Sequence, residues 1–113
     1  MNDTRPVSPC IDQTQEDIET YYRNAEIGQI AVVRHTQHHI LLYRVLEIES
    51  RDPPCIYVRN AGAFYMKSGK NRHHPTGQTS LVVPTHEVLA WANEHPRGEL
   101  GYSVYRPVGF FGR

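Results

Sequence analysis

Two hydrophobic patterns divide the chain. Near the N-terminus, and again near residue 90, apolar residues recur every three or four positions, which is the period of a helix with one buried face. Between about residue 28 and residue 83, short runs rich in valine, isoleucine, leucine and tyrosine lie between turn residues, as is typical of β-strands. The chain therefore predicts a β-rich core with one helix before it and one after it.

The first helix is predicted over residues 12–25. Thr14 can act as its N-cap, and Glu16 and Asp17 follow in the first turn, where the helix dipole favours carboxylates. Helical spacing predicts one buried face, made of Ile18, Tyr21, Tyr22 and Ala25.

The second helix is predicted over residues 85–95. Thr85 is a suitable cap, and Pro96 and Gly98 end the helix. Residues of one predicted face can bury against the β-rich core, and these are Val88, Trp91, Ala92 and His95.

Five short strands are predicted in the middle of the chain, over residues 29–34, 39–49, 55–60, 63–67 and 79–83. Their spacing of roughly ten residues, with short turns between them, favours an antiparallel barrel over βαβ units. The fold class we predict is mainly β, or α+β: a small five-stranded SH3-like barrel flanked by two short helices. Residues 28–83 would form the barrel in a single domain, residues 1–11 a loose N-terminus, and residues 98–113 a C-terminal strand or tail.

Composition sets the broad class of the protein. With 113 residues, 39% of them hydrophobic, the chain is long enough for one small core. It contains no apolar run of membrane-spanning length and no secretion signal at its polar N-terminus, so we expect a cytoplasmic protein. Cys10 and Cys55 do not form a CxxC pair, and reduced thiols are expected, although a disulfide between them stays open.

Charge is unevenly distributed along a chain whose formal net charge is zero. Residues 1–27 carry six carboxylates and two arginines, whereas residues 53–86 carry no carboxylate and four cations. Such an asymmetry can steer an anionic partner toward one face. Alternatively, the acidic and basic segments neutralise each other in the fold.

Alternation along residues 55–67 predicts a hairpin with two different faces. Its core face would hold Ile56, Val58, Phe64 and Met66. Aromatic and basic residues would share the outer face and continue into the loop "MKSGKNRHHPTGQ" (66–78). Because cations follow phosphates and flat rings stack on bases, this pattern indicates a surface for single-stranded nucleic acid. The predicted site comprises Tyr57, Arg59, Tyr65, Lys67, Lys70, Arg72, His73 and His74; an ordinary solvated face is the alternative.

Metal binding and catalysis are weakly indicated. The triplet His35, His38 and His39 could meet the pair His73–His74 in space, but the spacing matches no zinc motif and no carboxylate lies beside these groups. We therefore expect no metal and no cofactor. No serine lies in a nucleophile motif, so a non-enzyme is expected, and a small nuclease that uses the histidine pair with Lys70 stays an open alternative.

Three segments carry a resemblance to a known group of proteins: "GQIAVVR" (28–34), "LLYRVLEIESRDPPCIYV" (41–58) and "AFYMKSGKNRHHPTGQ" (63–78). With the basic turn "KSGK" (67–70) and the helix start "PTHE" (84–87), they resemble small SH3-like barrel proteins of phages and bacterial genomes over about half of the chain. The resemblance implies a barrel that contacts nucleic acid or protein, and it carries over no catalytic residue.

The sequence therefore favours two functions. The leading one is a non-enzymatic module that binds nucleic acid through the hairpin face and loop. The alternative is a protein-interaction or inhibitor module that acts on a host protein, a role that a phage-like origin would fit. It would use the acidic helix at 14–25 or the aromatic tail that ends in "GFFGR" (109–113), both of which depart from the resembling group.

Overall fold

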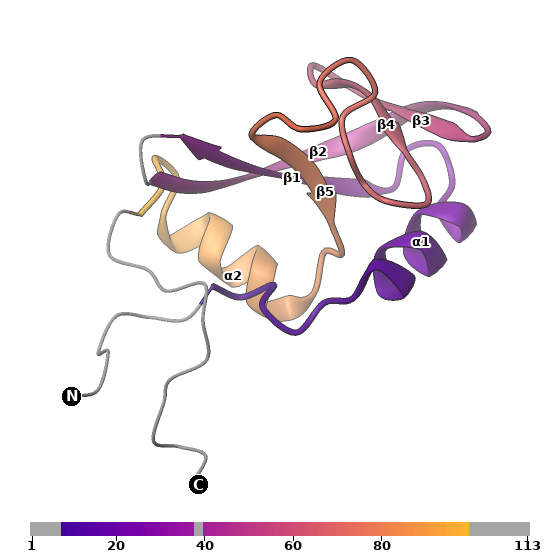
Figure 1. Ribbon diagram of the computed structural model, residues 1–113. Helices are drawn as coiled ribbons and strands as arrows, with labels where there is room; N and C mark the ends of the chain where they lie inside the picture. Colours follow the sequence, from indigo (N-terminus) through magenta and orange to yellow (C-terminus); the bar gives the residue numbers. More distant parts are fainter. Residues whose placement is uncertain (1–7, 38–39, 100–113) are drawn as a thin grey trace, which may run out of the picture.

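A computed structural model of the chain describes residues 8–37 and 40–99. These residues form two helices and five strands (Figure 1). In chain order the elements are α1 (Gln15–Asn24), β1 (Ile30–Gln37), β2 (Ile40–Asp52), β3 (Cys55–Val58), β4 (Gly62–Tyr65), β5 (Thr79–Val82) and α2 (His86–Glu94). Each predicted helix and each of the five predicted strands of the barrel is present, with bounds that differ by a few residues.

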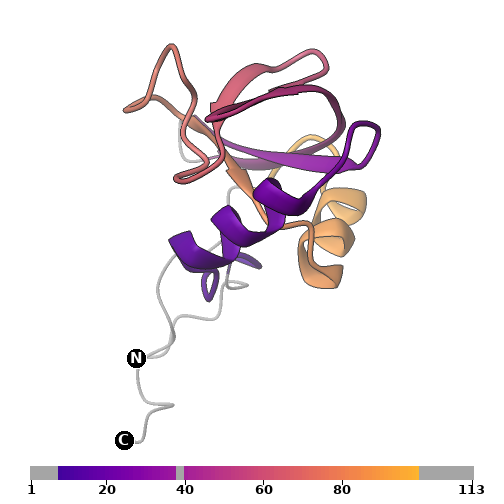
Figure 2. The same ribbon diagram turned by 90° about the vertical axis from the view of Figure 1, so that its right-hand side faces the viewer.

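The strands form one antiparallel sheet in the order β4-β3-β2-β1-β5. β2 is the longest strand and belongs to both halves of the sheet, because it pairs with β1 along most of its length and with β3 at its end. The register with β3 shifts between Ile48 and Ser50, and such a bulge bends a strand and increases its twist. The sheet therefore curls into a half-barrel (Figure 2), which confirms the predicted fold class.

A short extended segment, residues 69–72, bridges the two edge strands and is called the strap below. On one side, the Tyr65 amide donates to the Lys70 carbonyl and the Arg72 amide donates to the Ala63 carbonyl, both at 2.9 Å. On the other side, the Leu81 amide donates to the Gly69 carbonyl at 2.7 Å. The strap thus fills the opening of the half-barrel between β4 and β5.

The interior of the half-barrel is the larger of two hydrophobic clusters. The four residues predicted for the core face of the hairpin, Ile56, Val58, Phe64 and Met66, are all buried in it. Tyr22 of α1 joins them, and its hydroxyl donates to the Val82 carbonyl at 2.5 Å and accepts from the Val32 amide at 3.2 Å. Burial raises the pKa of this hydroxyl well above its ordinary value. One end of the half-barrel is therefore covered by α1.

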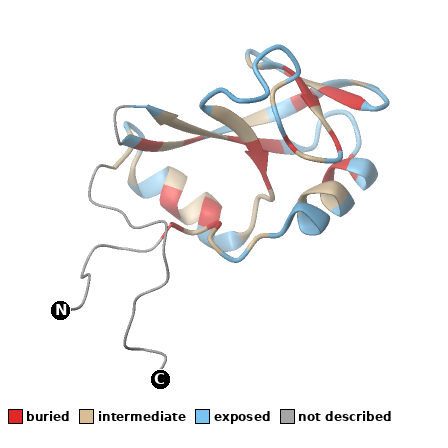
Figure 3. Cartoon of the chain, viewed as in Figure 1, coloured by how far each residue is buried: buried red, intermediate tan, exposed pale blue. Residues whose placement is uncertain are grey.

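The second cluster lies on the outer surface of the sheet, where α2 packs against it. The predicted residues Val88 and Trp91 are buried between α2 and the sheet, beside Leu41 and Val82. Figure 3 shows α2 with buried positions among exposed ones. The Thr85 hydroxyl accepts from the Val88 amide and caps the helix as predicted. The sheet therefore packs against α2 on one face and encloses the larger cluster, with Tyr22 of α1, on the other.

The segment before α1 is anchored to the sheet, although the sequence predicts a loose N-terminus. The buried hydroxyl of Tyr43 lies 3.1 Å from Ser8 Oγ and 3.0 Å from Cys10 Sγ. Gln13 binds both backbone groups of Val83: its amide nitrogen donates to the carbonyl at 2.9 Å and its amide oxygen accepts from the N–H at 2.7 Å. These contacts hold the part of the segment that the structure describes.

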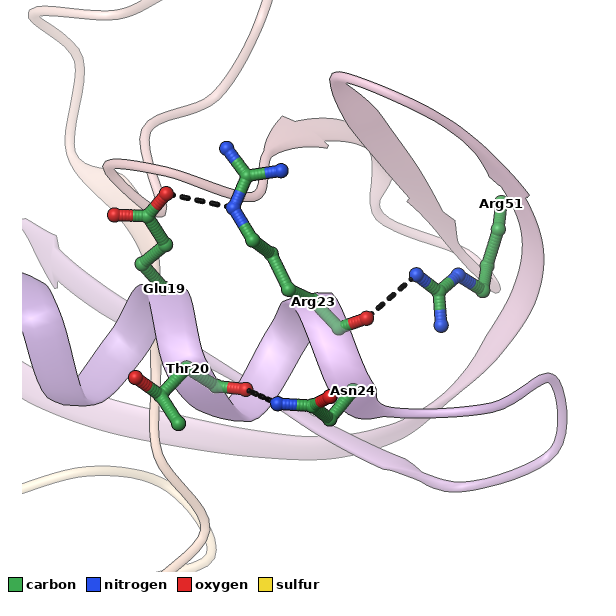
Figure 4. Close-up of polar contacts among 5 residues, drawn as sticks. All are labelled: Glu19, Thr20, Arg23, Asn24 and Arg51. Atoms are coloured by element: carbon green, nitrogen blue, oxygen red, sulfur yellow. Dashed lines mark hydrogen bonds and ion pairs between the residues drawn. The ribbon is translucent and has the colours of Figure 1, made fainter.

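Both ends of α1 are capped by side chains. Thr14 and Asp17 form a capping box, in which each side chain accepts from the other residue's amide. At the C-terminal end, the Arg51 guanidinium of β2 donates to the carbonyls of Arg23 and Ala25. Figure 4 shows the contact with Arg23. A cation at this end of a helix complements the helix dipole, so β2 and α1 are joined by charge as well as by packing.

The two cysteines are both free and both buried. The described chain ends at Glu99, which forms an isolated antiparallel bridge with Leu41 of β2. The rest of the predicted C-terminal strand or tail, residues 100–113, lies outside the described residues. Within the described ranges, neither helix is long and apolar enough to cross a membrane.

Candidate nucleic-acid interface

Three neighbouring extended segments, β3, β4 and the strap, build the surface on which the sequence places its candidate site. Tyr57 is paired with Ala63, and Cys55 is paired with Tyr65. The bridge between Phe64 and Asn71 sets Ala63 opposite Arg72 and Tyr65 opposite Lys70. Directly opposite residues share a face of a sheet, so two rows result. The first row is Tyr57, Ala63 and Arg72, and the second is Cys55, Tyr65 and Lys70.

This surface, called the outer face below, has small residues between larger ones. Ala63 and Cys55 are each only 3% exposed, whereas Tyr57 and Tyr65 are half-buried. By strand alternation Ala63 falls on the same side as Tyr65, and the structure places it on that side but buried among its neighbours. The Arg72 guanidinium reaches across Ala63 and donates to the Tyr57 hydroxyl at 3.3 Å. A cation and an aromatic ring are therefore held together in the first row.

Asn71 is the residue of the strap that turns away from the outer face. Its side-chain nitrogen donates to the Thr79 hydroxyl of β5 at 3.1 Å. Its side-chain oxygen accepts from the amides of His73 at 2.9 Å and His74 at 3.3 Å. Asn71 thus fixes the strap to β5 and turns the chain after Arg72, which keeps its two basic neighbours in the rows of the outer face.

The charges around the outer face are arranged asymmetrically. Lys67, Lys70 and Arg72 are exposed, and within the described part of the chain no carboxylate lies at ion-pair distance from them. On the opposite side, β2 contributes Glu47, 3.9 Å from Arg59, and Asp52, which is paired with Cys55 at the end of the second row. Cationic character therefore concentrates along β4 and the strap, with an acidic border along β2.

The structure brings four of the eight predicted site residues together and places the other four around them. Tyr57, Tyr65, Lys70 and Arg72 share the two rows. Arg59 lies at the border with β2, in an exposed pair with Glu47 of the kind that contributes little stability. The remaining three, Lys67 in the turn after β4 and His73 and His74 after the strap, are exposed.

Sequence reasoning missed two features of this site. It treats residues 66–78 as one loop, whereas residues 69–72 bridge two strands. It also gives no role to Asn71. The sequence does contain a signal for this strand-like segment. After Gly69, the cationic Lys70 and Arg72 alternate with the uncharged Asn71, as in a short strand with one inward-facing residue.

The histidines do not form a metal site in the described residues. His35 lies half-buried in β1, and His73 and His74 are exposed beyond the strap, while His38 and His39 fall outside the described ranges. Among residues 8–37 and 40–99, no three His, Cys, Asp or Glu side chains are grouped so that they could hold a metal ion. This part of the chain therefore gives no support to a metal site made by these histidines.

No protein-family model, curated protein or solved structure matches this chain. The resemblance to phage and bacterial barrel proteins thus stays a prediction. The outer face offers two aromatic rings, exposed cations and hydrogen-bonding groups on a frame of β3, β4 and the strap.

Proposed function

We propose that this protein is a non-enzymatic binding module for single-stranded nucleic acid, and that it acts through the outer face. The observation that carries the proposal is the register of the strap, which sets Arg72 in the row of Tyr57 and Lys70 beside Tyr65. Aromatic rings interleaved with cations are what a sequence-tolerant single-strand site needs, because every base has a face that stacks and every nucleotide has a phosphate.

The spacing of the rows favours a single strand over a duplex. Tyr57 and Tyr65 lie in adjacent rows, two residues apart along the strands, which is about 7 Å. Bases in a double helix rise by about 3.4 Å per nucleotide. A strand whose bases are splayed apart can place one base on each ring, whereas a stacked duplex cannot.

The charge asymmetry predicts the path of the backbone. Phosphates would follow β4 and the strap, where Lys67, Lys70 and Arg72 are exposed, and would avoid the carboxylates Glu47 and Asp52 on β2. His73 and His74 lie on the same side, where their imidazole N–H groups can donate to phosphate oxygens. With two or three phosphate contacts, the slope of log K against log salt should be about −1.4 to −2.1 for a single strand.

Fluorescence anisotropy with a labelled oligothymidylate, at low and moderate salt, tests this function. We expect binding that weakens with salt along that shallow slope, and a strong loss when Tyr57 and Tyr65 are both replaced by alanine. The variant Arg44→Gln is a matched control, because Arg44 is an exposed arginine on β2 beside α2, away from the outer face. Absence of binding at low salt would contradict the proposal.

A further inference from the structure

Among residues 8–37 and 40–99, no strand lies beside one edge of β2 over part of its length. Along this strand, Ile48 donates to the Gln29 carbonyl on the β1 side, whereas Leu41 exchanges both backbone hydrogen bonds with Glu99 on the other side. The backbone groups of successive residues point to opposite edges of an antiparallel strand. The N–H and C=O groups of the odd-numbered residues of β2 therefore point away from β1.

Two of these odd-numbered residues have no strand partner on that edge in the part of the chain that the structure describes. Glu99 covers Leu41, and the Arg59 amide donates to the Glu47 carbonyl at 2.9 Å, where pairing with the β3 side begins. Between them, no described strand pairs with Tyr43 or Val45 on the side away from β1. Tyr43 is buried, but Val45 is 44% exposed, so Val45 is the position most open to a new strand.

This edge opens into a groove shared with α2. The groove has a volume of about 650 Å³ and lies between residues 42–46 of β2 and the α2 side, where Leu89, Ala92, Asn93 and Pro96 line it. Its walls are mostly apolar, and Arg44 is the one charged side chain among the residues that line it. An unpaired edge beside an apolar helix wall is the arrangement that receives an extended peptide by strand addition.

We infer that this groove binds an extended segment of a partner protein, which adds to β2 as an antiparallel strand. The Leu41–Glu99 bridge already uses the same edge in antiparallel sense, and the added strand would continue that ladder to Val45. The chemistry of the groove specifies a segment with apolar side chains toward Leu89 and Ala92 and one carboxylate that reaches Arg44. A second copy of the chain fits less well, because its own α2 flanks the edge that it would have to insert.

A phage-displayed library of random dodecapeptides, selected against the full chain, supplies the probe. We expect enrichment of peptides with alternating apolar residues and an Asp or Glu. The synthetic form of the best peptide should then shift the amide resonances of Tyr43, Val45 and Glu47. A library that enriches no peptide, or a peptide that shifts only residues elsewhere, would overturn the inference.

Two further comparisons test strand addition itself. Val45→Pro removes the N–H that faces the free edge and leaves the β1 ladder intact, so peptide affinity should fall at least tenfold, while Val45→Thr should bind nearly normally. If Val45→Pro does not fold, the selected peptide with N-methyl groups on alternate residues tests the same contact on the wild-type chain. Equal binding of both N-methylated registers would overturn the inference.

The other occupants of the groove give distinct results. If light scattering shows a dimer that Val45→Pro converts to a monomer, a second copy uses the edge and the inference is wrong. It is also wrong if peptides bind only after residues 100–113 are deleted, because the chain's own tail then fills the groove. None of these results depends on whether the outer face binds nucleic acid.

Discussion

The Arg72 guanidinium lies across Ala63 from Tyr57 and donates a hydrogen bond to its hydroxyl at 3.3 Å. The two residues are 15 positions apart in the chain and meet because the strap adds a strand beside β4. One change at Tyr57 can remove the ring and the hydroxyl together, and another can remove the hydroxyl alone. This pair therefore offers a way to separate stacking from charge placement.

Replacing Tyr57 by alanine should weaken binding of an oligothymidylate by about 1–3 kcal/mol, which is at least about fivefold, because a stacking surface is lost. Tyr57→Phe retains the ring and loses only the acceptor of the Arg72 hydrogen bond. We therefore expect Tyr57→Phe to keep most of the affinity in the same anisotropy titration. Equal losses in the two variants would show that stacking is not the role of this ring.

The triple variant Lys67→Ala, Lys70→Ala and Arg72→Ala should bind more weakly and with a flatter salt dependence. Each lost phosphate contact should reduce the slope of log K against log salt by about 0.7 for a single strand. Titrations at four or more salt concentrations measure this slope. A triple variant with unchanged affinity and slope would mean that the site lies elsewhere. Arg44→Ala, which removes an exposed arginine away from the outer face, is the control.

Replacing Asn71 by alanine should loosen the strap. It removes the donor to Thr79 and the acceptor for the amides of His73 and His74, and we expect the free energy of unfolding to fall by about 1–2 kcal/mol. Nucleic-acid affinity should fall as well, although Asn71 faces away from the ligand. Asn71→Asp retains the acceptor and should fall between alanine and wild type in urea denaturation and in anisotropy.

Gly69→Ala should destabilise the fold more than Gly28→Ala does. Both glycines have positive φ, 74° at Gly69 and 92° at Gly28, which costs a non-glycine residue about 1–2 kcal/mol. A Cβ at Gly69 would also lie 2.9 Å from the Leu81 carbonyl oxygen, whereas one at Gly28 would meet nothing within 4 Å. The difference between the two midpoints in urea measures the steric part, and equal midpoints would contradict a close approach of the strap to β5.

Tyr43→Phe should change how stability depends on pH. Burial, with the neighbouring Cys10 as a smaller cause, raises the pKa of the Tyr43 hydroxyl far above its ordinary value. Above about pH 10 the unfolded tyrosine loses its proton while the folded one keeps it, so this residue's contribution to stability falls as pH rises.

Urea denaturation at pH 9 and pH 11 measures this effect. The wild type should lose about 1.4 kcal/mol more than Tyr43→Phe over this interval. Equal losses would indicate that the hydroxyl ionises freely in the folded protein. At pH 7, Tyr43→Phe should be less stable than the wild type by about 1 kcal/mol, because it lacks the hydrogen bonds to Ser8 and Cys10.

The sequence predicts the elements of this fold well because local signals agree with burial. Thr14 and Thr85 cap the two helices as expected. Pro53 follows directly after Asp52, the last residue of β2. The alternation in 55–67 separates Ile56 and Phe64 from Tyr57 and Tyr65 correctly, because the first two side chains are fully buried in the core and the two tyrosines are only half-buried.

The relations between distant segments could not be predicted in the same way. The strap has few apolar residues, so no hydrophobic period marks it, and its partners Ala63 and Leu81 are set by the curl of the sheet. The sequence also does not predict that Tyr43 and Val45 lack a described strand on the edge away from β1. This follows from the positions of the Leu41–Glu99 bridge and of the first pairing with β3. The sequence therefore predicts which residue types make the candidate site, but not the pairing that sets Arg72 opposite Ala63 and Lys70 opposite Tyr65.

Gln13 defines a boundary of the folded unit. Its side-chain amide presents one donor and one acceptor to Val83, as a neighbouring strand would at the end of β5. A chain shortened to begin at α1 would lose this pairing together with the Ser8 and Cys10 contacts of Tyr43. Two separate places in the sheet would then open to water at once. The smallest portion of this protein that folds as a unit should therefore include residue 8, although residues 9–14 separate it from the first helix.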